Sequence, residues 1–249
     1  MKKILPLSLL ILILFSCKKD KPAPPAVTVP VKFTSTTYKT LSPFDASGKP
    51  ETMETPDVVS AGLLNFLHTT LPEHVNLETT HPELLATTAI GDIIVTQKTE
   101  LHATFVSEGA AYANAIAFYT YPTNNPPASA ADIKVITYIF PNAGANTTLV
   151  AGDKVDIGSF DAGTSVGFVL MKNAWDPTIK NLDTDVVHYC SDDVLNPEVD
   201  PKLKKHAVLL NYTPESKTLI GFEDVDRTYA GCDNDFNDIV FYISQTTPK

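Results

Sequence analysis

Ten short segments rich in β-branched and aromatic residues follow one another from residue 92 onward, and no helical pattern interrupts them. They lie at residues 92–96, 100–106, 113–121, 133–140, 154–157, 165–171, 186–189, 206–212, 218–222 and 237–243. Turn-forming stretches such as residues 124–127, Asn-Asn-Pro-Pro, separate them. Strands that follow one another without crossover helices pair in antiparallel sheets. The pattern therefore predicts a mainly β fold, an antiparallel β-sandwich or jelly roll.

A small helical region is expected ahead of these strands, between residues 57 and 88. Residues 57–71 carry apolar side chains at helical spacing, and Pro72 ends the pattern. A second short helix is expected at 82–85, and a first strand at 27–37, where apolar and polar residues alternate. We therefore divide the main part of the chain into two regions. They are an N-terminal strand and helical cap region, residues 32–99, and a β domain, residues 100–245.

The N-terminus is typical of a bacterial lipoprotein signal peptide, residues 1–16. Lys2 and Lys3 precede an apolar run at residues 4–15. This run is too short to cross a bilayer as a helix, which needs about 20 residues, and it fits the apolar core of a secretory signal. Residues 14–17, Leu-Phe-Ser-Cys, resemble a lipobox. The alternatives are an ordinary signal peptide with an incidental cysteine, and a buried helix.

Cys17 is the residue that we expect to be lipidated, with palmitate among its acyl chains. Residues 17–31 then form a tether, because charged residues followed by four prolines favour extended backbone. Lys18 and Lys19, rather than aspartate, follow the cysteine, which favours export to the outer membrane. We therefore expect a lipid-anchored protein at the outer membrane or cell surface of a Gram-negative bacterium, with the membrane as a partner through the anchor.

The segment 223–238 carries the strongest chemical signal in the chain. It holds six carboxylates in sixteen residues between two apolar strands, and crowded charges of one sign repel each other. Calcium takes about six to eight oxygen ligands, whereas magnesium keeps several waters and suits the segment less. We expect a Ca²⁺ site. Its ligands would be Glu223, Asp224, Asp233, Asp235, Asn237 and Asp238. The alternative is a solvated acidic turn.

The spacing of these acids matches an EF-hand only in part. Asp233, Asp235 and Asn237 occupy the first three ligand positions of an EF-hand loop. Asp238 stands where such a loop needs glycine, and Ser244 stands where it needs a bidentate glutamate. The residues that follow are strand-like rather than helical. The segment is therefore interpreted as a calcium-type loop that enters a strand.

Several motifs together resemble the C-terminal domain of LruC-type bacterial lipoproteins, a domain of unknown function that also occurs in many secreted and surface proteins. The strongest is Gly-Phe-Glu-Asp at 221–224, followed by Asp-Asn-Asp-Phe-Asn-Asp-Ile-Val-Phe at 233–241. Further matches lie at residues 104–114, 118–121, 139–142, 167–170, 196–198 and His206. The resemblance covers roughly residues 100–245. It departs from the pattern at Ala111 and Ala117, where glycine is expected.

This resemblance implies a β-sandwich at the cell envelope that holds calcium, and it implies no reaction. It also makes Glu108 and Asn114 candidates for a second oxygen-rich patch, because both belong to the domain's other strong motif. The alternative is that these two residues belong to a plain turn.

Three further features bear on the expected site and partners. They are the cysteines, the single tryptophan and the net charge. Cys190 and Cys232 can form a disulfide in an oxidising compartment or remain two separate thiols, and no zinc-like spacing occurs. Trp175 follows a strand and is a candidate ligand contact, since an exposed indole stacks on sugars; the alternative is a half-buried loop anchor. A formal charge of −10 without a basic stripe argues against nucleic acid.

We therefore expect a non-enzymatic, calcium-binding envelope lipoprotein, an adhesion or ligand-binding module whose surface partner is a glycan or a protein. Two alternatives are a carbohydrate-binding surface lipoprotein and a hydrolase that uses the acidic residues. An enzyme is disfavoured because the carboxylates crowd one loop, and no nucleophile elbow or phosphate-binding glycine loop occurs. His206 opens an apolar strand and is expected to be packed and hydrogen-bonded rather than a base.

Overall fold

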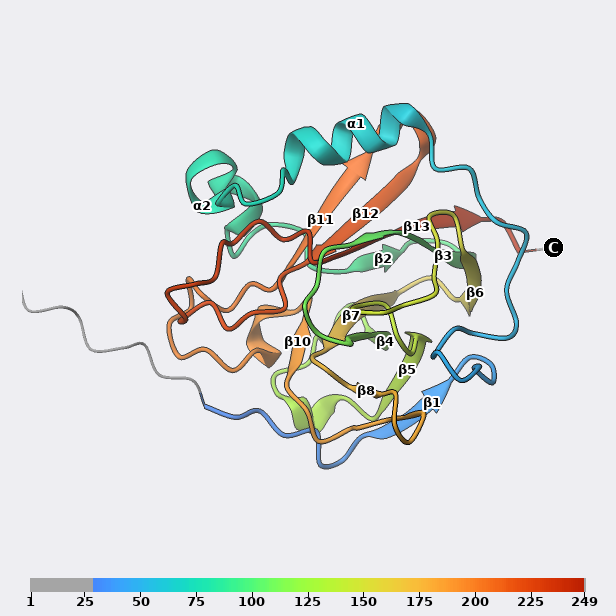
Figure 1. Cartoon of the computed structure of the whole chain (residues 1–249), viewed down its shortest axis with the longest axis horizontal. Coiled ribbons are helices and arrows are strands. Elements are labelled where there is room, and N and C mark those ends of the chain that lie inside the picture. Colours follow the sequence, from blue (N-terminus) through green and yellow to red (C-terminus); the bar gives the residue numbers. More distant parts are fainter. Residues whose placement is uncertain (1–28, 249) are drawn as a thin grey trace, which may run out of the picture.

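The computed structural model describes residues 29–248, and its chain forms two β-sheets that pack on each other (Figure 1). The six-stranded sheet has the order β1 (Thr37–Thr40), β5 (Val135–Phe140), β4 (Ala115–Pro122), β7 (Thr164–Met171) and β10 (His188–Cys190), with β2 (Ile93–Val95) also paired to β7. The five-stranded sheet has the order β11 (Ala207–Tyr212), β12 (Lys217–Phe222), β13 (Ile239–Thr246), β3 (Thr99–Glu108) and β6 (Lys154–Phe160). β8 (Trp175–Asp176) and β9 (Asn181–Leu182) form a small third sheet. All described pairs are antiparallel except β1 with β5.

The main hydrophobic core lies between the two large sheets. Phe168 of β7 meets Phe241 of β13 edge to face, with ring centroids 5.4 Å apart. Phe222 of β12 stacks on Phe241 at 6.4 Å. Each sheet contributes one face of its strands to this core, which is the arrangement of a sandwich. The predicted mainly β, antiparallel sandwich-like fold is confirmed.

Both sheets are also covered on their outer faces, and this explains why several strands read as unbroken apolar runs. In β4, Ile116 and Phe118 belong to the main core, whereas Ala117 and Tyr119 belong to a second cluster on the opposite face. The N-terminal segment covers that second cluster through Phe33. A sheet that is buried on both faces loses the alternation of apolar and polar residues.

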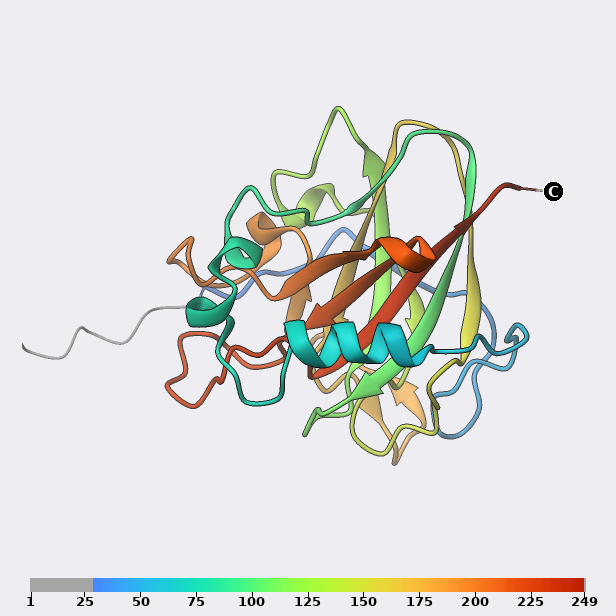
Figure 2. The same ribbon diagram turned by 90° about the horizontal axis from the view of Figure 1, so that it is seen from above.

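The helix α1 (Ala61–Thr70) covers the outer face of the five-stranded sheet (Figure 2). Its Leu63 and Leu67 pack in a third cluster with residues of β11, β12 and β13. The helix begins later than the predicted residue 57 because the Ser60 hydroxyl caps it, accepting a hydrogen bond from the Leu63 amide at 3.0 Å. The remaining helices are α2 (Leu77–Thr80), η1 (Pro82–Leu85), η2 (Ala130–Asp132), η3 (Asp193–Leu195) and η4 (Thr213–Glu215).

The predicted first strand at residues 27–37 is wrong. Its first two residues lie outside the described part of the chain, and residues 29–36 form no strand. β1 begins at Thr37, whose amide donates to the Lys134 carbonyl at 2.9 Å. A turn precedes it, closed by the Thr36 amide and the Phe33 carbonyl. The alternation in this segment serves to bury Phe33, which stacks on His188 with ring centroids 4.5 Å apart.

The predicted signal peptide, the lipidated Cys17 and the tether as far as residue 28 lie outside the described residues. The chain is described from Val29, whose amide donates to the Pro197 carbonyl at 2.8 Å. Within residues 29–248, no helix has the length and apolar character that crossing a membrane requires.

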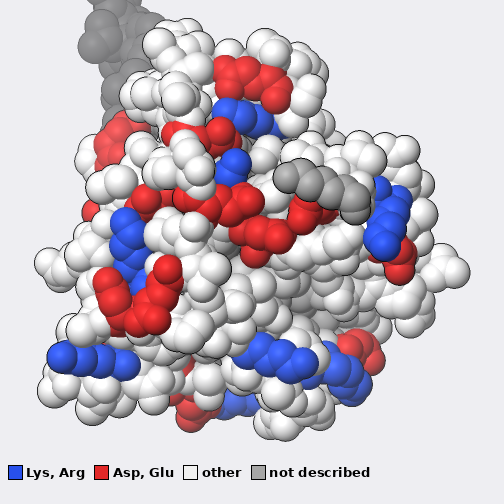
Figure 3. All heavy atoms as spheres, turned by 90° about the vertical axis from the view of Figure 1, so that its right-hand side faces the viewer, with Lys and Arg blue, Asp and Glu red and all other residues white. Residues whose placement is uncertain are grey.

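Charges of both signs occur on the side of the sandwich that carries the C-terminus (Figure 3). Lysine side chains alternate there with aspartates and glutamates, and the described residues of this face form no continuous basic surface.

Candidate metal centre

The acid loop, residues 223–238, joins two neighbouring strands of the five-stranded sheet. Phe222 at the end of β12 pairs directly with Ile239 at the start of β13. The chain therefore leaves and re-enters the sheet at adjacent positions, which brings Glu223 and Asp224 close to Asp238. Figures 1 and 2 show this loop at the end of the sandwich that also carries α2. The Leu77 amide of α2 donates to the Asn234 carbonyl of the loop at 3.0 Å.

Backbone conformation and one close approach set the shape of the acid loop. Asn234 and Phe236 both have φ of 58°, a left-handed conformation that few residues adopt. Phe236 is fully buried against α1 and the outer sheet face. Its carbonyl passes so close to Gly221 that a Cβ on that residue would lie 2.3 Å away. Only glycine fits at position 221, because the loop folds back over the strand that precedes it.

Arg227 holds the loop from within. Its Nε donates to Asn234 at 2.6 Å, and one terminal nitrogen donates to the carbonyls of Lys202 and Lys205 at 3.2 and 3.1 Å. The other terminal nitrogen pairs with Glu78 of α2 at 2.7 Å. The guanidinium also lies over the Phe236 ring. The Arg227 guanidinium therefore stabilises the shape of the loop, and it forms no ion pair with the acids of the two trios.

The inner trio consists of Glu223, Asp224 and Asp238. One carboxylate oxygen of each lies within 4.8 Å of the other two. The Asp224 amide donates to the Asp238 carboxylate at 2.7 Å, and the Asn114 amide donates to the Asp224 carboxylate at 2.6 Å. The side-chain oxygen of Asn114, Oδ1, accepts from the backbone amide of Asn173 at 2.9 Å. The inner trio is thus supported from β4 and the loop after β7.

The outer trio consists of Glu223, Asp233 and Asp235, and it obeys the same 4.8 Å limit. His74, in the loop between α1 and α2, lies above it. The His74 amide donates to Asp235 at 2.8 Å, and its Nδ1 lies 2.9 Å from an Asp233 oxygen. Glu73, His74 and Asp235 form a third, more exposed group. Carboxylates therefore run from the interior to the surface.

Burial without cationic partners raises the pKa of most of these acids. The pKa of Asp238 rises to about 9, chiefly through burial and then through the charges of Asp224 and Glu223. Burial is also the main cause of the raised pKa values of Glu223, Asp224 and Asp235. Within residues 29–248, no lysine or arginine forms an ion pair with these four carboxylates. The site as it stands holds excess negative charge.

Glu223 is the acid of the site with a buried carboxylate oxygen that lacks a hydrogen-bond partner. Its side chain is fully buried, and its Oε2 has no hydrogen-bond partner among the described residues. Its other oxygen accepts from the Val225 amide at 3.3 Å, and the Cys232 thiol lies within hydrogen-bonding reach of the carboxylate. An unpaired buried carboxylate oxygen is costly, so the arrangement fits a bound cation. All the atoms of the two trios that could bind a metal are hard carboxylate oxygens, which suit calcium better than softer metals.

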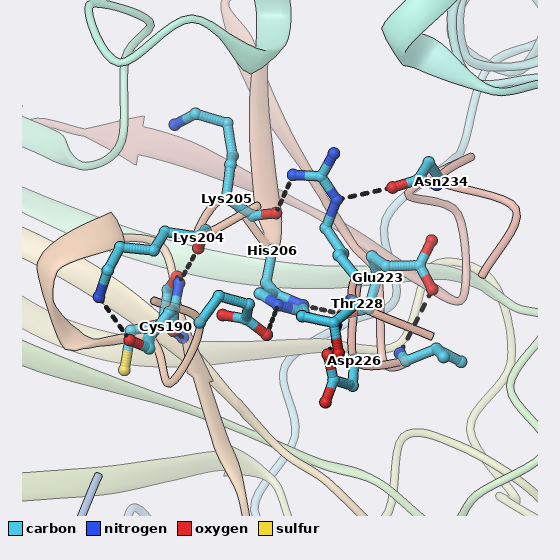
Figure 4. Close-up of polar contacts among 12 residues, drawn as sticks. Cys190, Lys204, Lys205, His206, Glu223, Asp226, Thr228 and Asn234 are labelled. Carbon is cyan, nitrogen blue, oxygen red and sulfur yellow. Dashed lines mark hydrogen bonds and ion pairs between the residues drawn. The ribbon is translucent and has the colours of Figure 1, made fainter. Parts of the chain in front are cut away.

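His206 lies next to Glu223 (Figure 4) and is hydrogen-bonded to both Glu223 and Glu198. His206 is fully buried, its Nδ1 donates to the Glu223 carbonyl at 3.0 Å, and its Nε2 lies 2.9 Å from a Glu198 oxygen. The ring stacks on Tyr189 with centroids 3.8 Å apart. The prediction that His206 is packed and hydrogen-bonded is confirmed. Glu198 was not predicted to act here, although it belongs to a sequence motif of the resemblance.

The structure places the five predicted carboxylate ligands in the two trios. The side-chain nitrogen of Asn237, the sixth predicted ligand, donates to the Leu71 carbonyl at 3.3 Å, just after α1. Asn237 thus ties the loop to the end of the helix, and the role of its side-chain oxygen as a ligand stays a prediction. Sequence reasoning missed Glu73 and His74, because only the fold carries them to the loop. No histidine or acid spacing in the chain signals that approach.

Of the two residues predicted for a second oxygen-rich patch, Asn114 is fully buried and its side-chain nitrogen donates to the inner trio. Glu108 is exposed at the end of β3, where it pairs in register with Ile239. The patch itself stays a prediction.

Two further expectations are corrected. Trp175 is 3% exposed and packs edge to face on Phe44 at 5.6 Å, so its ring offers no surface to a ligand. Cys190 and Cys232 are both free thiols, so the disulfide is not formed. Cys190 is sealed in the cluster outside the six-stranded sheet, whereas Cys232 lies in the acid loop.

Fold and site together define a β-sandwich domain that gathers five carboxylates in its last hairpin. A protein family described as "Domain of unknown function (DUF4114)" matches residues 160–246, which include the whole acid loop. The match begins at the end of β6, yet β13 pairs with β3, so the sheets extend beyond the matched residues. A search of curated proteins and a search of solved structures gave no match.

Proposed function

We propose that this chain is a non-enzymatic, calcium-binding lipoprotein of the cell envelope, similar to LruC-type lipoproteins, that acts as an adhesion or ligand-binding module. The observation that carries the calcium part is the buried Glu223 oxygen without a partner, at the junction of the two trios. The ion would replace the missing cationic partner and fix the last hairpin of the five-stranded sheet. The carboxylates available to bind calcium are those of Glu223, Asp224, Asp233, Asp235 and Asp238.

A binding role is favoured over catalysis by where the acids lie. Glycosidase carboxylates flank a cleft and stand apart across it, whereas the inner acids here are buried within one loop. The carbohydrate-binding alternative depended on an exposed Trp175, and that ring is buried. These two observations favour the binding module over the hydrolase and over the carbohydrate-binding lipoprotein.

Calcium should raise the melting temperature of the purified chain. With the ion at about 100 times its dissociation constant, the native state gains about 2.7 kcal/mol. For a chain of this size that corresponds to an increase of roughly 5–10 °C over an EDTA-treated sample. Thermal unfolding followed by circular dichroism, with Ca²⁺, with Mg²⁺ and with EDTA, measures the effect. Equal melting temperatures in Ca²⁺ and EDTA would contradict the calcium proposal.

A matched pair of variants separates the site from general loop effects. Asp235→Asn removes a carboxylate of the outer trio and should clearly reduce the calcium-dependent increase. Asp226→Asn makes the same chemical change in the same loop, outside both trios, where the side chain accepts from the Thr228 amide. This control should retain the full increase, since an asparagine oxygen also accepts that hydrogen bond.

Replacing Cys17 with serine should release the protein from membranes. Without the thiol no acyl chain can be attached, and the described domain has no other apolar anchor helix. The measurement is the incorporation of labelled palmitate together with the fraction of protein that sediments with membranes. Wild-type labelling and sedimentation in the Cys17→Ser variant would end the lipoprotein part of the proposal and leave the calcium part standing.

A further inference from the structure

The charge of the acid loop exceeds what one calcium ion can balance. Glu223, Asp224, Asp233, Asp235 and Asp238 carry five formal negative charges when ionised. One Ca²⁺ would leave an excess of three charges in a largely buried place, and two ions would leave an excess of one. No lysine or arginine of the described chain forms an ion pair with the inner acids.

We propose that the loop binds two calcium ions side by side, one in each trio, with the Glu223 carboxylate as the bridge between them. This inference rests on the proposed calcium-binding function and specifies its site. The two trios share Glu223 and no other residue. Each trio supplies two carboxylates of its own, and a carboxylate has two oxygens, so Glu223 can serve both ions at once.

The spacing of the oxygens fits one ion per trio. Calcium–oxygen distances are about 2.3–2.6 Å, so two ligands of one ion lie at most about 5 Å apart. Within each trio the three oxygens lie within 4.8 Å of one another. The five carboxylates form two such groups rather than one group of five. A single ion would therefore leave the acids of one trio without a cation.

Glu223 is placed and left free in the way that a bridging ligand needs. Its amide donates to the His206 carbonyl at 2.9 Å, and its carbonyl accepts from the His206 ring at 3.0 Å. The backbone is thus held from both sides. The carboxylate is fully buried, and Oε2 is without any described partner. The lack of a partner for this oxygen does not depend on how many acids the loop contains, and it indicates that a ligand is missing.

The two ions should differ in how easily they leave. Asp224 of the inner trio is 1% exposed, and Asn114 supports it from within the sandwich. Asp233 of the outer trio has a side chain that is 41% exposed, and only the exposed His74 lies over it. The outer ion is therefore nearer to solvent and should exchange first.

Calcium stoichiometry tests the proposal directly. Isothermal titration of the calcium-free purified chain with CaCl₂, checked by native mass spectrometry, should give two ions per chain. Asp233→Asn and Asp224→Asn should each retain one ion, and Glu223→Gln should weaken binding of both by at least tenfold. The control Asp226→Asn should keep two. Circular dichroism of each variant with excess Ca²⁺ checks folding, and the half-exposed Asp233 keeps the test available if Asp224→Asn fails to fold.

The outcomes separate this inference from the proposed function. One ion in the wild-type chain overturns the two-ion site and leaves a calcium-binding loop. No ion overturns both. Loss of both ions in Asp233→Asn, or retention of both at wild-type affinity in Glu223→Gln, shows that the trios are not two sites joined by Glu223.

Discussion

Replacing Arg227 with alanine should lower the free energy of unfolding by about 3–5 kcal/mol, because several buried partners lose their donor at once. Arg227 is the only arginine in the chain and is 5% exposed. Its guanidinium contacts Asn234, Glu78 and two carbonyls of the 202–205 segment. Without it, those carbonyls and the Asn234 oxygen remain buried and unpaired. Urea unfolding in saturating Ca²⁺ measures the loss.

Two comparisons sharpen this expectation. Arg227→Lys keeps the charge but offers a single ammonium in place of the planar fork, so it should recover less than half of the lost stability. Lys39→Ala removes an exposed cation from β1 and should change stability by no more than about 0.5 kcal/mol. If Arg227→Ala cost no more than Lys39→Ala, the guanidinium would not be what holds the loop.

His206→Ala should destabilise the chain by a similar amount, about 3–5 kcal/mol, because it leaves Glu198 buried without a partner. Both side chains are fully buried, and the second Glu198 oxygen already has no described partner. The Nδ1 hydrogen of His206 points at the Glu223 carbonyl, and Nε2 faces a Glu198 oxygen. Removing the ring would also remove its stacking on Tyr189. Denaturant unfolding at pH 7 gives the free-energy change.

A double variant distinguishes an uncompensated charge from a cavity. His206→Phe fills the space of the ring but still leaves Glu198 unpaired, so it should be destabilised by several kcal/mol. Adding Glu198→Met removes the carboxylate and should restore part of that loss, since replacing both members of a buried pair costs less than replacing one. A double variant that is less stable than His206→Phe alone would show that packing, rather than the charge, dominates.

The strands from residue 92 onward were predictable because the local sequence pattern favours the same extended conformation that the sheets require. Each of the ten predicted segments overlaps an observed strand. β1 was misplaced because its partner is β5, a parallel neighbour almost a hundred residues away, and no local pattern encodes that pairing. The start of α1 was displaced because Ser60, three residues after the predicted start, provides the cap.

The acid loop was predictable for a related reason. Glu223, Asp224 and Asp238 lie beside two strands that pair, so their proximity follows from the hairpin alone. Contributions from distant segments were not predictable. His74 reaches the loop through the path between α1 and α2, and Trp175 is buried in a place where the distant Phe44 packs on it. The contact of the Asn237 side-chain nitrogen with Leu71, just after α1, does not follow from the spacing of the acids either.

The direct pairing of Phe222 with Ile239 has a consequence for how the chain folds. β13 is the middle strand of its sheet, and it joins β12 to β3, which lies more than a hundred residues earlier. Closing a sixteen-residue loop costs about 1.2 kcal/mol more than closing a four-residue one, and repulsion among the acids adds to that cost. Ions that bind this loop would lower the barrier to forming the hairpin. With the proposed calcium binding, the calcium concentration around the chain would set how fast the sandwich assembles, as well as how stable it is afterwards.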